Sequence, residues 1–461
     1  MPRWAISLVC AAALCWAPGA LAGTFTKTDA TLAADDGVSL AYSLYVPDGQ
    51  GPFPAVMLFH GLGQTRASED GYAQALASAG YVALAPDARG HGQSGGLFSL
   101  DGPREIQDVR ELFATLTARK DVIASKVGAF GVSLGGGIVW NAAVAGVPFA
   151  ALEPVITWTD LDQALVPQGL PKTGAIFLFA SSVAGKIDPA LAPLLPDLLA
   201  GRNLGPIEAA LVARSSRPKL ATLSTPTFLI QGRTDYAFDI DQAVAGYRLL
   251  TGPKRLYIGD LGHSPAANPP AELPHLQSEQ IAWFDKYLKG APVDLGKPVE
   301  LAASPWNGRT QSYADVPAPT SRAGLDFRLR GSIAGTGKLV VRGPALPGGN
   351  AETFGAPVLT LKLGAGTTFP HVIAVLTAGS AIVSEGGTTL KPGAQTVRIK
   401  MIATSVPIPA GTRLTLTIAG ASTAQTPANL LYPNVVPAST RLTLIGGSLA
   451  LPLLRTPISF P

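Results

Sequence analysis

Between about residues 24 and 288, two hydrophobic patterns alternate along the chain. Short, continuous apolar runs that end at glycine turns are typical of buried strands, whereas apolar residues at every third or fourth position are typical of helices. The clearest runs are PAVMLFHG (54–61), YVALAPDARG (81–90) and KVGAFGVS (126–133), and the clearest helix is GPREIQDVRELFATLTARK (102–120). This alternation predicts a mostly parallel sheet with helices on both faces.

The alternation stops between residues 153 and 223. This stretch is rich in Pro, Leu and Ala and contains short helical pieces such as PALAPLLPDLLAG (189–201). We interpret it as a helical cap inserted at the edge of the sheet. The apolar segment GAIFLFASSVAG (174–185) is too short to span a bilayer, which takes about 20 residues, so it is expected to be a cap helix.

The composition and the hydrophobic pattern of the sequence change again after residue 289. Residues 290–321 have the composition of a linker, and the segments beyond them alternate with the period of two that is typical of strands, as in TRLTLTIAG (412–420). We therefore predict an α/β domain over residues 23–300, followed over residues 301–461 by a linker and an all-β sandwich of jelly-roll type.

The first 22 residues resemble a cleaved signal peptide. Arg3 is followed by an apolar run and then by a small-x-small cleavage site at Ala20–Ala22. Both cysteines, Cys10 and Cys15, lie in this segment, so the mature chain is expected to lack disulfides, thiolate catalysis and cysteine-bound metals. The expected location is the periplasm or the extracellular space, without stable membrane insertion after cleavage.

Charge adds little to this picture. Charged residues make up 14% of the 461 residues, against roughly 25% in an average protein, and the net charge is +4. The sequence has no Lys/Arg cluster of the kind that binds nucleic acid, no metal-ligand cluster and no dinucleotide-binding loop. We expect no cofactor and no metal, and a small-molecule partner; the oligomeric state stays open.

One serine lies in a context that indicates chemistry. In GAFGVSLGGG (128–137), Ser133 stands between Gly131 and Gly135, after a predicted strand and before a predicted helix. This is the context of a G-x-S-x-G nucleophile elbow, in which glycines permit a tight turn that presents the hydroxyl at the end of the sheet. Ser133 is therefore the predicted nucleophile; the alternative is an idle serine in a glycine-rich turn.

A nucleophilic serine needs a base, and in this fold the chain order is nucleophile, acid, histidine. That order excludes His60 and His91, which precede Ser133, and His371 lies in the predicted β region. His263, on the loop after a predicted strand, is the predicted base, and His275, at the start of the last helix, is the weaker candidate. The five histidines are His60, His91, His263, His275 and His371.

The acid is expected on the loop after the preceding strand, in TFLIQGRTDYAFDID (227–241). Asp235 comes first in that loop and is the predicted acid. Asp239 is interpreted as a helix N-cap, and Asp260 is a rival on the histidine's own loop. The acid would hold the tautomer of the histidine and stabilise its imidazolium.

Two backbone N–H groups are predicted to form the oxyanion hole: that of Leu134, directly after the nucleophile, and that of Leu62, in HGLGQ (60–64). Trp158, Phe177 and Phe179 in the insertion are the predicted substrate-binding residues, because apolar and aromatic side chains suit an acyl or aryl group. The alternative is that these aromatic residues form only the core of the cap.

The motifs GVSLGG, HGLG, DARGHGQS, QGRTD and DLGHS, in the order in which the fold requires them, resemble the α/β-hydrolase superfamily. With the β-sandwich that follows, the chain resembles the group of cocaine-esterase-like acyl esterases and Xaa-Pro dipeptidyl peptidases. The resemblance implies a capped hydrolase domain before a jelly roll, with Ser133, Asp235 and His263 as its triad. Members often take one oxyanion donor from a tyrosine; the matching loop here, HGLGQTRAS, has none, which favours a backbone donor.

We therefore expect an exported serine hydrolase that cleaves carboxylic esters. The alternative is a peptidase that removes dipeptides ending in proline, which would need a carboxylate for the substrate's free amine; Glu153 is the candidate. A third possibility is a hydrolase fold kept for adhesion, against which the intact order of serine, aspartate and histidine counts.

Overall fold

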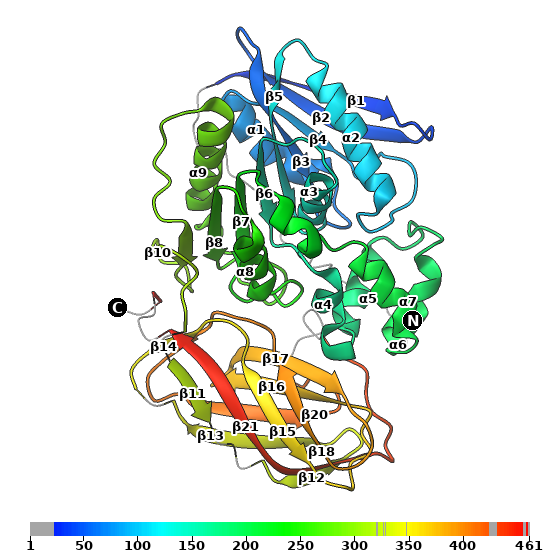
Figure 1. The fold of residues 1–461 in the computed structure, drawn as a ribbon, viewed down its shortest axis with the longest axis vertical. Coiled ribbons are helices and arrows are strands. Elements are labelled where there is room, and N and C mark those ends of the chain that lie inside the picture. The colour runs from blue at the N-terminus through cyan, green and yellow to red at the C-terminus, as the bar shows by residue number, and fades with distance from the viewer. Residues whose placement is uncertain are drawn as a thin grey trace, which may run out of the picture.

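The computed structural model describes residues 23–319, 321–325, 327, 329–346, 348–423, 431–454, 458 and 459. The predicted signal peptide, residues 1–22, lies outside the described residues. The chain forms a sheet flanked by helices and, below it in Figure 1, a sandwich of strands, with a group of helices beside the junction of the two. The predicted fold class, an α/β-hydrolase fold followed by a β-sandwich, is confirmed.

A ten-stranded sheet is the centre of the first part, here the sheet domain. Its strands lie in the order β1-β2-β4-β3-β5-β6-β7-β8-β9-β10, and the run from β4 to β9 is parallel. The central strands are apolar along their whole length because helices cover both faces. The bounds are β1 (Phe25–Ala33), β2 (Ser39–Pro47), β3 (Phe53–Phe59), β4 (Val82–Pro86), β5 (Val122–Val132), β6 (Ala151–Val155), β7 (Thr227–Gly232), β8 (Lys254–Gly259), β9 (Val299–Ala302) and β10 (Thr310–Tyr313).

Helices pack on both faces of this sheet, each through one apolar side. On one face lie α2 (Pro103–Thr117), α3 (Leu134–Val144) and α8 (Ile240–Leu249), and on the other lie α1 (Asp70–Ser78) and α9 (Leu273–Phe284). The spacing predicted for α2 is confirmed, because Ile106, Val109, Leu112 and Leu116 are buried in the core on one face. Short helical turns complete this part: η1 (Arg66–Glu69), η4 (Arg217–Thr222) and the π-helical turn η5 (Asp285–Lys289).

The insertion between β6 and β7 forms the predicted group of helices, here called the cap. Its elements are α4 (Leu161–Leu165), η2 (Pro167–Gly169), α5 (Thr173–Ser182), η3 (Ala192–Leu194), α6 (Leu195–Ala200) and α7 (Leu204–Val212). Glu153, where the insertion was predicted to begin, lies within β6 of the sheet. Among the described residues, no helix has both the length and the apolar character that crossing a bilayer requires.

The stretch interpreted as a linker contains two strands of the sheet. β9 pairs in parallel with β8, and β10 returns antiparallel to β9 at the sheet edge. Residues 299–302 are fully buried. The composition of this segment hid the strands because each is only four residues long and is surrounded by Gly, Pro and Asn.

The C-terminal part is a sandwich of two antiparallel sheets around its own apolar core. One sheet contains β11 (Ser321–Leu325), β12 (Gly331–Ala334), β14 (Ala351–Thr353), β15 (Val358–Leu363), β18 (Gln395–Lys400), β19 (Pro407–Ile408) and β21 (Arg441–Leu454), and the other contains β13 (Lys338–Ala345), β16 (His371–Ala378), β17 (Ala381–Thr389) and β20 (Arg413–Ala419). The jelly-roll connectivity stays a prediction.

The sandwich and the sheet domain share buried contacts. Phe354, Leu454 and Ile458 from the sandwich region belong to the same apolar cluster as one face of the ten-stranded sheet. At the end of β7, the buried side chain of Arg233 lies 3.1 Å from the carboxylate of the equally buried Glu352. A charge pair without solvent access persists only where both partners are held in place. The junction is therefore a packed interior rather than a loose contact.

Because of this junction, we expect that a chain ending at Ala303 will be insoluble or unstable. The truncation would expose the apolar side chains that face the sandwich and would leave Arg233 without its partner. The measurement is the soluble fraction after expression, compared with that of the full chain. A soluble truncation with unchanged ester kinetics would contradict this and make the sandwich an independent module.

Candidate active site

Ser133 occupies the turn between β5 and α3. Its backbone has φ 56° and ψ −111°, a strained conformation for a residue with a side chain. A Cβ atom on Gly131 would lie 2.2 Å from the carbonyl oxygen of Gly135, and one on Gly135 would lie 2.0 Å from that of Phe59. Only glycine fits at either position, which is the physical reason for the G-x-S-x-G pattern.

The Ser133 side chain begins a chain of hydrogen bonds. Its Oγ lies 2.8 Å from Nε2 of His263, and Nδ1 of that histidine lies 2.7 Å from Oδ2 of Asp235. Because the Nδ1–H of His263 donates a hydrogen bond to the carboxylate, Nε2 is left without a proton and can accept the serine proton. All three side chains are buried. The three residues selected from the sequence are thus in contact, in the geometry that nucleophilic catalysis by serine requires.

Asp235 is held on its loop by the backbone. Its Oδ2 also accepts a hydrogen bond from the N–H of His263 at 3.0 Å, and its Oδ1 accepts from the N–H groups of Ala237 and Phe238 at 2.9 and 3.0 Å. Of the rival acids, Asp260 accepts instead from the Ser304 hydroxyl. Asp239 is the N-cap residue of α8, as expected, and its Oδ2 accepts a hydrogen bond from the N–H of Ala403 in the sandwich region.

The two residues predicted to supply the oxyanion donors are both found in the lining of the cavity at Ser133. Leu134 is the first residue of α3, where N–H groups have no partner within the helix, and Leu62 lines the same cavity as Ser133. The loop of Leu62 is positioned by His60, whose Nδ1 lies 2.8 Å from the Gly61 carbonyl and whose Nε2 accepts from the N–H of Ala88. Burial, together with nearby His91, lowers the pKa of His60 to about 4, so this histidine is neutral.

An apolar cavity of about 130 Å³ opens from Ser133 into the cap. Trp158 and Phe179 line it as predicted, and Phe179 lies edge-on to His263 with 6.0 Å between the ring centroids. Most other lining residues are aliphatic. They include Leu161, Leu165, Ile176, Val183, Leu194, Leu198, Ile207 and Leu211.

Phe177, the third predicted substrate-binding residue, does not line this cavity. It is 55% exposed on the outer side of α5, whereas Ile176, Phe179 and Ala180 face inward on the same helix. Each residue along a helix turns the side chain by about 100°, so Phe177 and Phe179, two positions apart, point to nearly opposite faces of α5.

Phe238 and Arg214 also line the cavity, and neither was selected from the sequence. Phe238 follows Asp235 by three residues and packs edge-on to His263, with 5.2 Å between the centroids. Its position three residues after the predicted acid could have indicated in the sequence that Phe238 lies at the active site. Arg214 contributes the one charged group to the described lining, and the carbonyls of Ser99 and Ala210 bind its guanidinium. Sequence alone offered no signal for this arginine.

Glu153 does not face the cavity. It is fully buried within β6, where its Oε2 accepts hydrogen bonds from the Tyr72 hydroxyl at 3.0 Å and from the Gln280 amide at 3.2 Å. Burial raises the pKa of this carboxyl well above its usual value. It is not available to bind the free amine of a peptide substrate.

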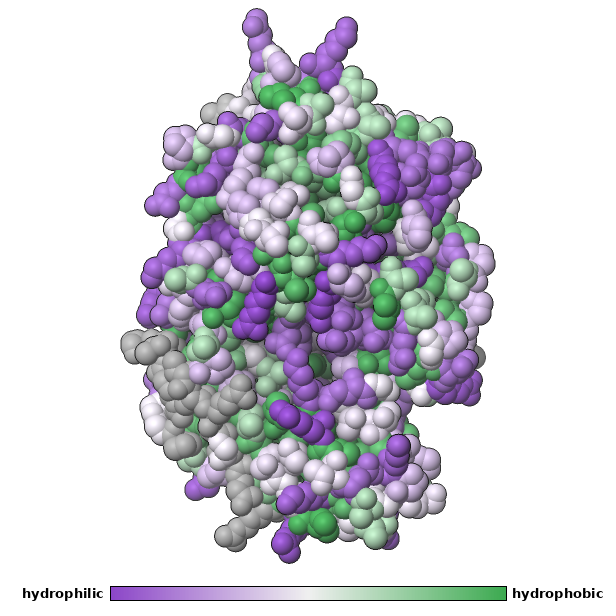
Figure 2. Space-filling view, in the orientation of Figure 1, coloured by the Kyte–Doolittle hydropathy of each residue, from purple (hydrophilic) through white to green (hydrophobic). Residues whose placement is uncertain are grey.

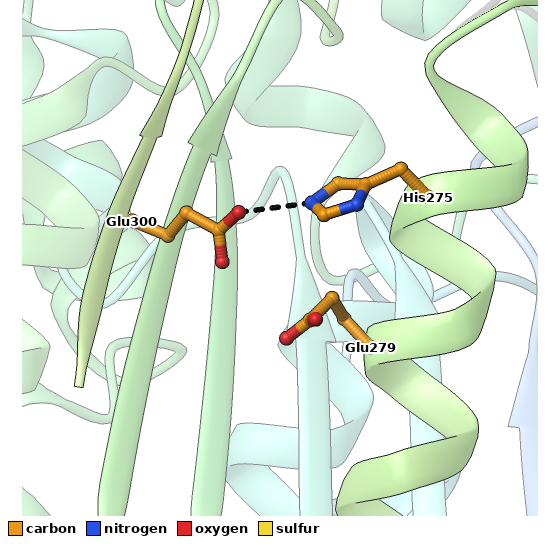
Figure 3. Close-up of side chains that lie close together, drawn as sticks. All are labelled: His275, Glu279 and Glu300. Carbon is orange, nitrogen blue, oxygen red and sulfur yellow. Dashed lines mark hydrogen bonds and ion pairs between the residues drawn. The ribbon is translucent and has the colours of Figure 1, made fainter. Parts of the chain in front are cut away.

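His275, Glu279 and Glu300 form a second cluster, away from Ser133 (Figure 3). The His275 ring nitrogen lies 2.9 Å from Glu300, and this hydrogen bond raises the pKa of the histidine. The guanidinium of Arg255 binds the carboxylates of both glutamates. Since a cation already neutralises the cluster, we interpret it as an ion-pair network between α9, β8 and β9 rather than a metal site.

Comparisons with known proteins agree with this architecture. The family model of X-Pro dipeptidyl-peptidase (S15 family) matches residues 36–265. A CocE/NonD family hydrolase from Staphylococcus aureus superposes with a TM-score of 0.73 over 93% of this chain and 94% of that chain, at 14% identity. An alpha-amino acid ester hydrolase gives a TM-score of 0.66 over 95% of this chain and 98% of that chain, at 13% identity.

Among curated proteins, a monoacylglycerol lipase from Mycolicibacterium smegmatis is 33% identical over 117 residues. That alignment covers 25% of this chain and 41% of the lipase, so the chain spans less than half the length of this relative.

Proposed function

We propose that this chain, a hydrolase of the S15 and CocE/NonD group, is a serine esterase that cleaves carboxylic esters with an apolar acyl group. The observation that carries the proposal is the hydrogen-bonded series Ser133–His263–Asp235 at the mouth of an apolar cavity. The series supplies a nucleophile and a base, and the cavity supplies a place for the acyl chain.

In the proposed reaction, Ser133 Oγ attacks the carbonyl carbon of the ester while His263 Nε2 takes its proton. The N–H groups of Leu134 and Leu62 stabilise the oxyanion of the tetrahedral intermediate. The C–O bond to the alcohol then breaks, and the alcohol leaves with the proton from His263. Water, deprotonated by the same histidine, attacks the acyl-enzyme and releases the acid. Asp235 stabilises the imidazolium in both steps.

The cavity supports an apolar substrate. Its described lining contains Ser133, Arg214 and otherwise side chains without charge, most of them aliphatic or aromatic. Burying a chain of methylene groups there would contribute about 0.8 kcal/mol for each group. The relative named monoacylglycerol lipase supports the same substrate class for the region that it matches.

The second candidate is an X-Pro dipeptidyl peptidase, which the match to the S15 model favours. Such an enzyme needs an anionic group for the substrate's free amine. Among the described residues that line the cavity, none carries a carboxylate, and the candidate Glu153 is buried in the sheet. An ammonium group without a partner would enter this cavity at a large desolvation cost.

A comparison of two substrate series tests the proposal. Purified chain is assayed with p-nitrophenyl esters of increasing acyl length and with X-Pro p-nitroanilides. We expect turnover of the esters, with kcat/KM rising as the acyl chain lengthens, and little turnover of the anilides. Turnover of the anilides in preference to every ester would establish the peptidase instead.

We also propose that the enzyme is exported. The support is the charged start, apolar run and small-x-small site of residues 1–22. The N-terminal sequence of the protein recovered from outside the cytoplasm tests this, with a start at Gly23 as the expected result. Recovery of the uncleaved chain from the cytoplasm alone would contradict it.

Two phenylalanines on α5 provide a matched test of the cavity. Phe179→Ala is expected to lower kcat/KM for long-chain esters by about 10- to 100-fold, because it removes an apolar wall beside His263. Phe177→Ala, the same change on the exposed side of the helix, is expected to stay within about twofold of wild type. Equal effects of both changes would mean that α5 acts only through its folding.

A further inference from the structure

Lys172 is a buried cation in the cap that lies close to the active site. It precedes α5, whose inner side lines the cavity, and only 3% of its surface is exposed. Its own N–H donates to the Leu165 carbonyl, and the N–H of Gly174 donates to the carbonyl of Leu431 in the sandwich region. The segment that carries Lys172 is therefore bound to the cap on one side and to the sandwich on the other.

The ammonium group of Lys172 binds the loop that carries Asp235. Nζ donates to the carbonyl of Tyr236 at 2.7 Å and to the carbonyl of Ala237 at 3.2 Å. These carbonyls belong to the same two peptide units whose N–H groups, on Ala237 and Phe238, donate to Asp235 Oδ1. In a trans peptide the C=O and the N–H point in opposite directions. A cation at the oxygens thus orients and polarises both donors toward the carboxylate.

The charges around Lys172 come from three parts of the molecule. Burial lowers the pKa of its ammonium group, and the carboxylates of Asp239, Asp235 and Glu385 oppose this shift. Glu385 lies on β17 of the sandwich, and burial raises its pKa to about 8. Tyr236 and Tyr432 lie near Glu385. Burial raises the pKa of both tyrosines above its usual value of 10, so their hydroxyls stay neutral where Glu385 titrates.

A polar cavity of about 520 Å³ lies at this meeting point of cap, sheet domain and sandwich. Its lining includes Lys172, Asp239, Glu385 and Lys400. Figure 2 shows hydrophilic side chains gathered across the middle of one face, where the sheet domain and the sandwich meet. The lysine is thus part of the contact that joins all three parts.

We propose that Lys172 is a positioning residue for the triad: through the peptide units of Tyr236–Ala237 and Ala237–Phe238, it holds the carboxylate of Asp235 against His263. The inference rests on the proposed function of the triad. It makes the acid of the triad depend on the seating of the cap and of the sandwich, since the lysine is held between them.

The test compares Lys172→Met and Lys172→Gln with Lys400→Met, a control that removes a cation of the same cavity. Lys400 pairs instead with Asp241 of α8 at 2.5 Å. We expect kcat for a p-nitrophenyl ester to fall about 10- to 100-fold in Lys172→Met with KM within about threefold, a smaller loss than the roughly 10⁴-fold cost of disabling a triad acid. The control should stay within about twofold.

The pH profile separates positioning from a structural role. Wild-type kcat should decline at alkaline pH as the ammonium group of Lys172 loses its proton. Because burial lowers the pKa of this group, the decline should begin at a pH below 10.5, the ordinary pKa of a lysine. Folded Lys172→Gln should have lower kcat and lack this decline. Wild type without an alkaline decline, or either variant with kcat within twofold of wild type, would overturn the inference. If Lys172→Met fails to fold, the kcat of Lys172→Gln and the pH profile of the wild type test the role of Lys172.

Labelling by a fluorophosphonate distinguishes a failure of the proposed serine esterase activity from a failure of the proposed role of Lys172. If wild type hydrolyses esters but is not labelled at Ser133, the proposed function fails. If labelling at Ser133 proceeds and the Lys172 variants are labelled as fast as wild type, only the inference about Lys172 fails.

Discussion

Replacing Ser133 with alanine is expected to abolish ester turnover, with a loss of about 10⁶-fold, and to abolish labelling by a fluorophosphonate. The hydroxyl lies 2.8 Å from His263 Nε2 and is the proposed nucleophile. Folding should survive, because alanine keeps the Cβ that already occupies the strained turn and removes only the hydroxyl. The measurements are kcat, covalent labelling and the melting temperature.

A matched control for this change is Ser181→Ala on α5, whose hydroxyl donates to the Phe177 carbonyl of its own helix. It should leave turnover and labelling unchanged. If Ser133→Ala were folded and still labelled, the nucleophile would have to be another residue, and the esterase proposal would lose its central observation.

The second large effect is expected at His263. Changing it to alanine should lower kcat by several orders of magnitude, because the serine loses its base and Asp235 loses its partner. His275→Ala should change kcat by less than about tenfold, since that histidine bonds to Glu300 in the ion-pair network. Its stability should decrease, because the network joins α9 to the sheet.

Steady-state kinetics and thermal unfolding of the two variants check this pair. A strong loss of kcat in His275→Ala with normal activity in His263→Ala would reverse the assignment of the base. A loss in both, with intact folding, would indicate that the Arg255 network positions the loop of His263.

The arrangement around Ser133 was predictable because its determinants are local. A continuous apolar strand, two glycines and a following helix define the turn, and the chain order then selects His263 and Asp235. The same logic failed for β9 and β10. Strands of four residues carry too little periodicity to be recognised, and their place at the sheet edge depends on pairing with β8.

The cap shows a different limit. The segment of α5 is apolar on all sides, so no polar face indicates which residues point inward, and Phe177 could not be separated from Phe179. Glu153 is the candidate for binding a substrate amine because it precedes the cap, but the sequence does not show where its side chain lies. Its partners Tyr72 and Gln280 lie 81 and 127 residues away in the chain, and only the packed fold reveals that they hydrogen-bond to its carboxyl group inside the sheet.

The shared core of sheet and sandwich matters for recombination between relatives. Phe354 and Leu454 pack in the same layer as the strands that carry the active site, and Arg233 is neutralised by Glu352 across the junction. A chimera that joined this sheet domain to a foreign sandwich would place mismatched side chains in that layer, at a cost of about 1–3 kcal/mol for each overpacked site. Productive crossovers must therefore transfer the complementary residues of both parts together.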